Sequence, residues 1–193
     1  MLKNNLVLIT GGTGDIGTAT AKQLDATFNH VVALDLLNDE QGKKWQQEIT
    51  KQGYKNIIFK HMDVTDFDQC KEVVDSIIDE FGSVDALVNN AGITRDAVFS
   101  KMTKQQWDEV LSVNLDGMFN VTRQVVEGMR AQESGRIVNV SSVNAQKGQF
   151  SQANYAASKA GVYGFTKSLS QELMMKNITV NSISPGYVNT RLM

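Results

Sequence analysis

Six short apolar runs, each followed by a segment with helical spacing, constrain this chain more than any other feature. The runs are rich in Val, Ile and Leu and lack polar alternation, which is typical of strands buried on both faces of a sheet. Strands that alternate with helices are joined by right-handed crossovers and form a parallel sheet. The pattern predicts a doubly wound α/β fold with strands at about 6–10, 31–34, 56–61, 84–89, 136–141 and 178–183.

Capping residues mark where the helices between these runs begin. Asn38 or Asp39, Asp66 and Thr103 each precede a segment with helical spacing and supply a side-chain oxygen for free backbone N–H groups. The helix after Thr103 is expected to break near Asn114. The predicted helices cover about 15–28, 39–52, 67–81, 104–130 and 153–175.

Composition limits the classes of function. The 193 residues, 41% of them hydrophobic, suit one globular domain over 1–193. A net charge of -2 provides no basic surface for nucleic acid, so nucleic-acid binding is not expected. Cys70 is the single cysteine, and no metal site is expected. Because the chain has no apolar run of ~20 residues and no signal-peptide pattern, we expect a cytoplasmic protein without membrane contact.

A glycine-rich turn joins the first strand to the first helix. Glycines let the backbone turn tightly and approach a pyrophosphate, while the helix N-terminus offers free N–H groups. Such a turn alone is often only a turn, but its place between strand and helix favours a Rossmann-type dinucleotide site. The residues expected to contact the cofactor here are Gly11, Thr13, Gly14, Asp15, Ile16 and Gly17.

Asp35 ends the second predicted strand, where this type of fold places a carboxylate on the adenosine ribose hydroxyls. A carboxylate would repel a 2′-phosphate, and no Arg or Lys lies between Asp35 and Lys43. We therefore favour NAD(H) over NADP(H), which remains possible. The alternative is that Asp35 only caps a turn.

Four further residues complete a recognisable pattern. Tyr155 and Lys159 stand four residues apart at the start of the long helix and share one of its faces. Ser142 follows the fifth strand, and Asn114 lies in the preceding helical stretch. Together with the glycine-rich turn, in this chain order, they resemble the catalytic tetrad of the short-chain dehydrogenase/reductase family. The alternative for Asn114 is a residue that only kinks its helix.

The resemblance implies an oxidoreductase that moves a hydride between a nicotinamide cofactor and a carbonyl or alcohol. Tyr155 would then donate a proton to the developing alkoxide. The Lys159 ammonium would lower the pKa of Tyr155 and hold the nicotinamide ribose. Ser142 would donate a hydrogen bond to the substrate oxygen, and Asn114 would hold a water that links Lys159 to solvent.

Other cofactor contacts follow from the same resemblance. Asp15 is a departure, because the family usually has glycine at this position; the extra carboxylate would weaken cofactor binding or disfavour NADP(H) further. The remaining residues are assigned to the adenine (Asp63, Val64), the ribose path (Asn90, Ala91, Gly92) and the nicotinamide carboxamide (Pro185, Gly186, Val188, Thr190).

Within the family, the strings at 90–96, 101–103, 135–139 and 141–150 resemble those of bacterial acetoacetyl-CoA reductases. This implies an acyl-CoA substrate that is reduced to the (R)-3-hydroxyacyl-CoA. It assigns the acyl group to Gln149, Phe150, Gln152 and Tyr187.

Two alternatives stay open. One is reduction of a 3-oxoacyl group on an acyl-carrier protein, which would need basic docking residues such as Arg95, Lys101, Arg123 and Arg130. The other is a dinucleotide-binding sensor or scaffold without turnover.

Family members usually continue past this length with a substrate lid and a seventh strand that joins subunits into a tetramer. We expect both parts to be missing here, and a full-length form to be a homotetramer.

Overall fold

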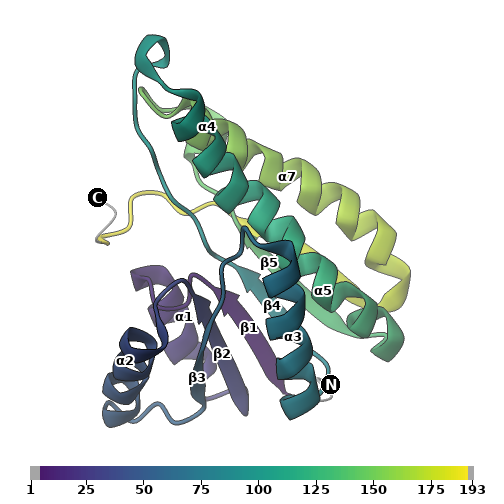
Figure 1. Ribbon diagram of the computed structural model, residues 1–193. Helices are drawn as coiled ribbons and strands as arrows, with labels where there is room; N and C mark the ends of the chain where they lie inside the picture. Colours follow the sequence, from purple (N-terminus) through teal and green to yellow (C-terminus); the bar gives the residue numbers. More distant parts are fainter. Residues whose placement is uncertain (1–4, 191–193) are drawn as a thin grey trace.

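The computed structural model describes residues 5–190 and contains one parallel sheet of six strands with helices on both faces (Figure 1). The strand order is β3-β2-β1-β4-β5-β6, and every neighbouring pair is parallel. The predicted doubly wound α/β fold is therefore confirmed. The strands are β1 (Leu6–Thr10), β2 (His30–Asp35), β3 (Ile57–His61), β4 (Ala86–Asn89), β5 (Gly135–Val140) and β6 (Ile178–Ile183).

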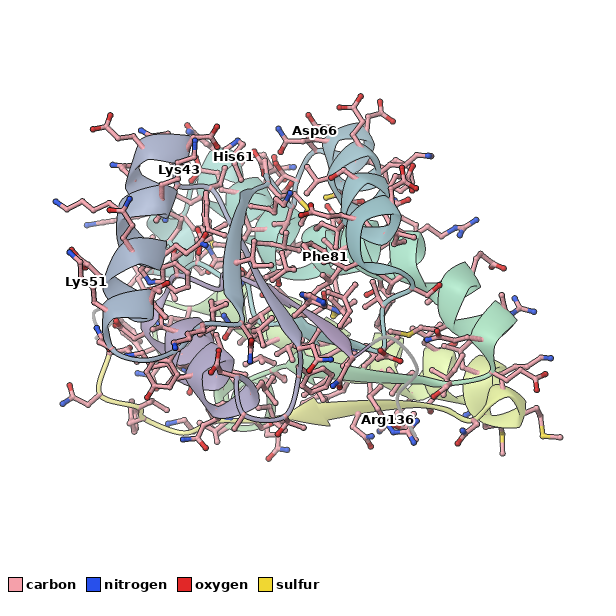
Figure 2. All side chains as sticks on the ribbon, turned by 90° about the horizontal axis from the view of Figure 1, so that it is seen from below. Lys43, Lys51, His61, Asp66, Phe81 and Arg136 are labelled. Atoms are coloured by element: carbon pink, nitrogen blue, oxygen red, sulfur yellow. The ribbon has the colours of Figure 1, made fainter. Side chains whose placement is uncertain are left out.

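The expected capping residues begin their helices. The side chains of Asn38, Asp66 and Thr103 each accept a hydrogen bond from the backbone N–H three residues later. Figure 2 shows Asp66 at this position on α3, and Lys43 and Lys51 along α2. The α-helices are α1 (Asp15–Leu24), α2 (Asp39–Lys51), α3 (Phe67–Phe81), α4 (Lys104–Leu111), α5 (Gly117–Gln132), α6 (Asn144–Lys147) and α7 (Ala153–Leu173).

Several predicted boundaries need correction. The first helix ends at Leu24, not near Phe28, because Phe28 instead packs into the core beneath the sheet. Strand β4 begins at Ala86, two residues later than expected. Helix α6 and the 3-10 turn Phe99–Lys101 were not predicted, since segments this short carry no periodicity.

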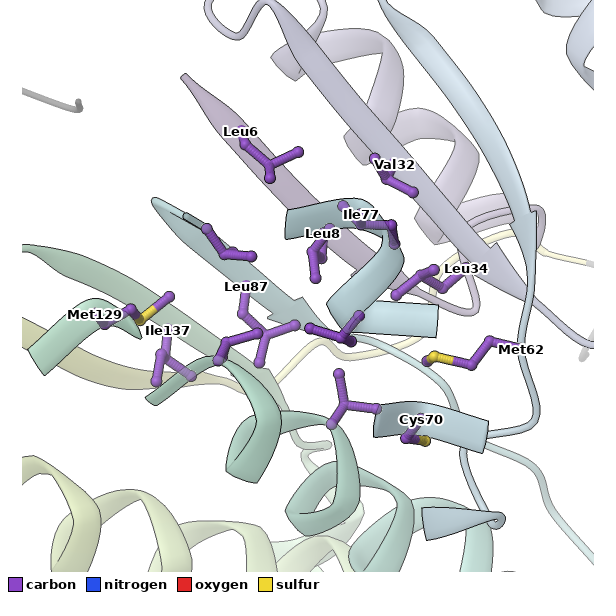
Figure 3. Close-up of a cluster of buried hydrophobic side chains, with 14 of the residues drawn as sticks. Leu6, Leu8, Val32, Leu34, Met62, Cys70, Ile77, Leu87, Met129 and Ile137 are labelled. Atoms are coloured by element: carbon purple, nitrogen blue, oxygen red, sulfur yellow. The ribbon is translucent and has the colours of Figure 1, made fainter. Parts of the chain in front are cut away.

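Strand β1 lies between two hydrophobic cores. Successive side chains of a strand point to opposite faces, so Leu6 and Leu8 join one core while Val7 and Ile9 join the other. The first core is completed by α3 and α5 (Figure 3) and by the end of α7, and the second by α1 and α2. All four side chains are fully buried, which explains the absence of polar alternation in the sequence.

The strand order reverses between β1 and β4, and this places a crevice at the carboxyl ends of the strands. The turn after β1 and the loop after β4 meet there. Asn90 Nδ2 donates hydrogen bonds to the carbonyl oxygens of Thr10 and Gly11, both at 3.0 Å. The two loops that border the crevice are therefore fixed to one another.

Residues 5–190 contain no helix with the length and apolar character of a bilayer span. In the same range, no three His, Cys, Asp or Glu side chains are grouped to bind a metal ion. The first four residues, part of the N-terminal stretch considered for a signal peptide, and the last three lie outside the described range.

Candidate active site

A cleft of about 990 Å³ occupies the crevice at the carboxyl edge of the sheet. It collects side chains from the loops after β1, β2, β4, β5 and β6 and from the start of α7. Most of the residues expected to contact cofactor or substrate line it: Gly11, Thr13, Gly14, Asp15, Ile16, Asp35, Val64, Asn90, Ala91, Gly92, Ser142, Gln152, Tyr155, Lys159, Pro185, Gly186, Tyr187, Val188 and Thr190. Gly17, Asp63, Asn114, Gln149 and Phe150 are not among its lining residues.

The glycine-rich turn is tight enough to require its glycines. Gly11 has a φ of +61°, and its carbonyl accepts a hydrogen bond from Gly14 N at 3.2 Å. A Cβ on Gly17 would lie 2.2 Å from the Gly11 oxygen. Gly17 therefore supports the turn from behind, while the first residues of α1 present the helix N-terminus to the cleft.

We expect Gly17→Ala to lower the free energy of unfolding by about 1–3 kcal/mol, because the added methyl displaces the turn. Urea denaturation of both proteins measures the difference. Gly164→Ala is the matched control: apart from the neighbouring backbone of α7, no described atom lies within 4 Å of a Cβ at this position, so this change should stabilise the protein by up to ~1 kcal/mol. Equal losses for both variants would contradict the role of Gly17.

The Asp35 carboxylate is held at the end of β2 by the glycine-rich turn. Its Oδ2 accepts hydrogen bonds from Thr13 N at 3.0 Å and Thr13 Oγ1 at 2.6 Å. Its Oδ1 accepts from Leu36 N at 2.8 Å. Asp35 thus stabilises a turn, as the alternative interpretation held, and also lines the cleft.

Lys159 is buried at the floor of the cleft, with 3% of its surface exposed. Its Nζ donates to the Val140 carbonyl at 2.8 Å and lies 5.8 Å from the centre of the Tyr155 ring. Burial lowers the pKa of Lys159 to about 8. Gly92 leaves room for this amine, since a Cβ there would lie 3.2 Å from Nζ.

The Tyr155 phenol has its pKa raised above the ordinary value. Burial is the main cause and the charge of Asp96 adds to it, while a hydrogen bond with Ser142 works in the opposite direction. This differs from the expectation that Lys159 lowers the pKa of Tyr155. The loss of water around the phenolate outweighs the favourable contacts, so Tyr155 is protonated at neutral pH and suited to act as an acid.

The Ser142 hydroxyl is buried next to Tyr155. Its Oγ accepts a hydrogen bond from Asn144 N at 3.1 Å. Because the hydroxyl already accepts from the main chain, its own proton is available for donation toward Tyr155 or a substrate oxygen.

Asn114 lies in a π-helical segment, Ser112–Asp116, between α4 and α5. This is the break that the sequence predicts, and such segments often occur at functional sites. Its Oδ1 accepts from Ile93 N at 2.8 Å, and its Nδ2 donates to Ile93 O and Ser158 Oγ, both at 3.1 Å. The side chain therefore fixes the loop after β4, and the water-holding role stays a prediction.

Of the four residues assigned to the acyl group, two line the cleft and two are exposed outside it. Phe150 is 79% exposed, and Gln149 is exposed beside it. Tyr187 lines the cleft, and its hydroxyl lies 3.3 Å from Lys147 Nζ. The Gln152 amide contacts protein on both sides, as it donates to Asp96 Oδ2 and accepts from Asn144 Nδ2, each at 2.9 Å.

Sequence analysis missed three polar residues that organise this wall of the cleft. Asp96 and Asn144 hold Gln152, and Asn154 donates to the carbonyls of Arg95 and Gln106 at 3.0 Å. Asp96 and Asn144 lie within the strings that carry the family resemblance. Their pairing has no local signal, because Asp96 and Gln152 are 56 residues apart.

A crevice at the strand-order reversal, bordered by a glycine turn and floored by a lysine beside a tyrosine, defines an NAD(P)-dependent oxidoreductase. Residues 5–193 match the family model for short chain dehydrogenases. The chain belongs to this family, the short-chain dehydrogenases/reductases.

Curated relatives and a solved structure support this assignment over almost the whole chain. An acetoacetyl-CoA reductase from Cupriavidus necator is 47% identical over 189 residues, which cover 98% of this chain and 76% of the relative. A 3-oxoacyl-(acyl-carrier-protein) reductase from Thermotoga maritima is 43% identical, with 98% and 76% covered. A crystal structure of NAD+-bound xylitol dehydrogenase superposes with a TM-score of 0.88 at 34% identity, covering 96% of this chain and 71% of that one.

Proposed function

We propose that this protein reduces the ketone of acetoacetyl-CoA, a 3-oxoacyl thioester, to the (R)-3-hydroxyacyl-CoA. The observation that carries the proposal is the 47% identity with an acetoacetyl-CoA reductase over 98% of the chain. The cleft supports it by placing a protonated Tyr155 beside Ser142 and Lys159.

The residues of the cleft fit a nicotinamide dinucleotide, which supplies the hydride when bound. The turn residues Gly11 and Gly14 line the cleft beside the first residues of α1, where the helix N-terminus would donate backbone N–H groups to a pyrophosphate. Asp35 would accept hydrogen bonds from the adenosine ribose hydroxyls, and its charge favours NAD(H) over NADP(H). The adenine contact is proposed for Val64, which lines the cleft, with Asp63 beside it; Asp63 holds its turn by accepting from Thr65 N and Oγ1.

Tyr155 donates its proton to the ketone oxygen as the carbonyl carbon receives the hydride, so that the ketone becomes an alcohol and Tyr155 becomes a phenolate. Ser142 donates a hydrogen bond to the same oxygen and stabilises its developing charge. Lys159, which carries its proton below a pH of about 8, stabilises the phenolate until solvent returns the proton.

The second candidate is reduction of a 3-oxoacyl group on a carrier protein, favoured by the relative from Thermotoga maritima. Two of the four proposed docking residues are ion-paired: Arg95 with Glu109 at 2.7 Å, and Arg130 with Glu127 at 3.6 Å. These pairs reduce the positive charge offered to an acidic carrier protein, and we therefore favour the CoA thioester. Assembly of the full-length protein into a homotetramer is a separate prediction.

Purified protein mixed with acetoacetyl-CoA should oxidise NADH, with a kcat/KM at least about tenfold higher than with NADPH. The reason is repulsion between Asp35 and a 2′-phosphate, which exceeds ~1 kcal/mol for like charges a few Å apart. Absorbance of the reduced nicotinamide follows the rate, and chiral analysis identifies the alcohol. Acetoacetyl-carrier protein is assayed in parallel, and faster turnover of it would favour the second candidate.

Asp35→Asn keeps an acceptor oxygen for Thr13 but removes the negative charge. The ratio of kcat/KM with NADH to kcat/KM with NADPH should therefore be smaller in this variant. Asp39→Asn is the control, because Asp39 lies four residues further along but does not line the cleft. Absence of turnover with every 3-oxoacyl thioester would refute the proposed function.

A further inference from the structure

A series of hydrogen bonds connects the surface of the protein to Ser142. Asp96, exposed in the loop after β4, accepts from Gln152 Nε2 at 2.9 Å. Gln152 Oε1 accepts from Asn144 Nδ2 at 2.9 Å, and Asn144 N donates to Ser142 Oγ at 3.1 Å. We call this series of four residues the Asp96 relay.

The carboxylate of Asp96 fixes the orientation of both amides in the relay. An ionised carboxylate only accepts hydrogen bonds, so Gln152 must turn its NH₂ group to Asp96 and its oxygen to Asn144. Asn144 must then turn its NH₂ group to Gln152. Rotating either amide by 180° would bring two acceptors or two donors face to face.

Among residues 5–190, this orientation leaves Asn144 Oδ1, in a residue that lines the cleft, without a hydrogen-bond partner. Within the relay, the Asn144 side chain is therefore held through its NH₂ group alone.

The relay ends at Ser142. Asn144 opens α6, a helix of four residues whose start is also held by the hydrogen bonds from Val143 N to Pro185 O and from Ala145 N to Ser142 O. With its side chain bonded to Gln152, the Asn144 N–H stays directed at Ser142 Oγ. This donor occupies the acceptor side of the Ser142 hydroxyl and leaves the hydroxyl proton to point at Tyr155.

We infer that Asp96 is a positioning residue, which acts through Gln152 and Asn144 to direct the Ser142 proton toward the reacting oxygen. This inference rests on the proposed function, because it deepens the account of how that reaction is catalysed. The Asp96 charge has a second consequence, since it disfavours the phenolate and raises the pKa of Tyr155.

Helix α7, which carries Tyr155, packs against α4 and α6, and these elements also carry charged groups. Lys159 lies 5.8 Å from the Tyr155 ring centre. Arg95, next to Asp96, is paired with Glu109 of α4, and Lys147 of α6 lies 5.0 Å from the Tyr187 ring centre. Among these charges, that of Asp96 raises the pKa of Tyr155, so its removal should act on Tyr155 directly.

Asp96→Asn tests the inference, because asparagine keeps the size but allows either amide orientation. We expect kcat for reduction to fall about tenfold, less than the 10²–10³ lost when an oxyanion donor is removed outright. The relay and the charge act on the pKa of Tyr155 in opposite directions, because a Ser142 proton directed at Tyr155 lowers this pKa and the Asp96 carboxylate raises it. The effect of the charge is therefore isolated in a Ser142→Ala background, where Asp96→Asn should move the alkaline limb of the rate profile to lower pH, since the protonated phenol is the active form. The same loss should vanish in a Ser142→Ala background, where the relay has no target.

An ultraviolet titration of tyrosinate, corrected with Tyr155→Phe, gives a readout without substrate. In a Ser142→Ala background, Tyr155 should ionise at lower pH when Asp96 is replaced by Asn. With Ser142 present this shift should be smaller, because the loss of the directed hydrogen bond raises the pKa of Tyr155. If the wild type reduces no 3-oxoacyl thioester, the proposed function fails, while this titration still decides whether Asp96 acts on Tyr155.

Asp75→Asn is the matched control, since it removes an exposed carboxylate of α3 that pairs with Lys71, away from the cleft. It should leave kcat, the pH profile and the titration unchanged. Two results would overturn the inference: Asp96→Asn with a wild-type kcat, pH profile and Tyr155 titration, or the same tenfold loss with and without Ser142.

Discussion

Tyr155→Phe is expected to lower the rate of ketone reduction by at least ~100-fold, the usual loss when a general acid is removed. Phenylalanine keeps the ring that packs near Lys159 but has no proton to donate. The raised pKa of Tyr155 sharpens this expectation, because the wild-type phenol is fully protonated at neutral pH. Steady-state rates with acetoacetyl-CoA and NADH measure the loss, and NADH binding followed by fluorescence should remain.

Tyr54→Phe provides the comparison, because Tyr54 packs against the core under α1 and α2 and does not line the cleft. Its rate should equal that of the wild type. If Tyr155→Phe also kept the wild-type rate, the proton would have to come from another group, and the assignment of Tyr155 would be wrong.

The sequence predicted the parts of this protein that depend on local pattern. Each strand is a short apolar run because the sheet is covered on both faces, as the complete burial of Leu6 to Ile9 shows. The helix starts at Asn38 and Asp66 follow from one side chain bonding a backbone N–H three residues away. The glycine turn and the pair of Tyr155 and Lys159 likewise depend only on neighbours in sequence.

The parts that escaped prediction depend on contacts between distant segments. The interaction of Asp96 with Gln152 spans 56 residues, and no spacing rule announces it. The direction of the Tyr155 pKa depends on how much water the folded chain excludes, which a motif does not encode. Gln149 and Phe150 illustrate the same limit, because only the path of the loop after α6 decides whether they face the cleft.

The buried ammonium of Lys159 should make the stability of this protein depend on pH. Its pKa is lowered from 10.5 to about 8 in the folded state, whereas the unfolded chain keeps the ordinary value. Between these two pH values the unfolded chain binds more protons, so the free energy of unfolding rises with pH. Below a pH of about 8 the folded protein bears the full cost of the buried charge, which is about 3 kcal/mol for this difference in pKa.

Lys159→Met removes that cost along with the catalytic amine. The difference in the free energy of unfolding, variant minus wild type, should therefore be about 2–3 kcal/mol larger at pH 7 than at pH 10. The variant should also lose activity. The hydrogen bond to the Val140 carbonyl is lost at both pH values, so the part of its energy that does not depend on pH cancels when urea denaturation at the two is compared. Lys167→Met, an exposed position on the same helix, controls for the loss of a lysine as such. If the difference in the free energy of unfolding between Lys159→Met and the wild type stayed constant with pH, water would have to reach the Lys159 amine. The cleft would then lack the buried ammonium on which the proton transfer from Tyr155 depends.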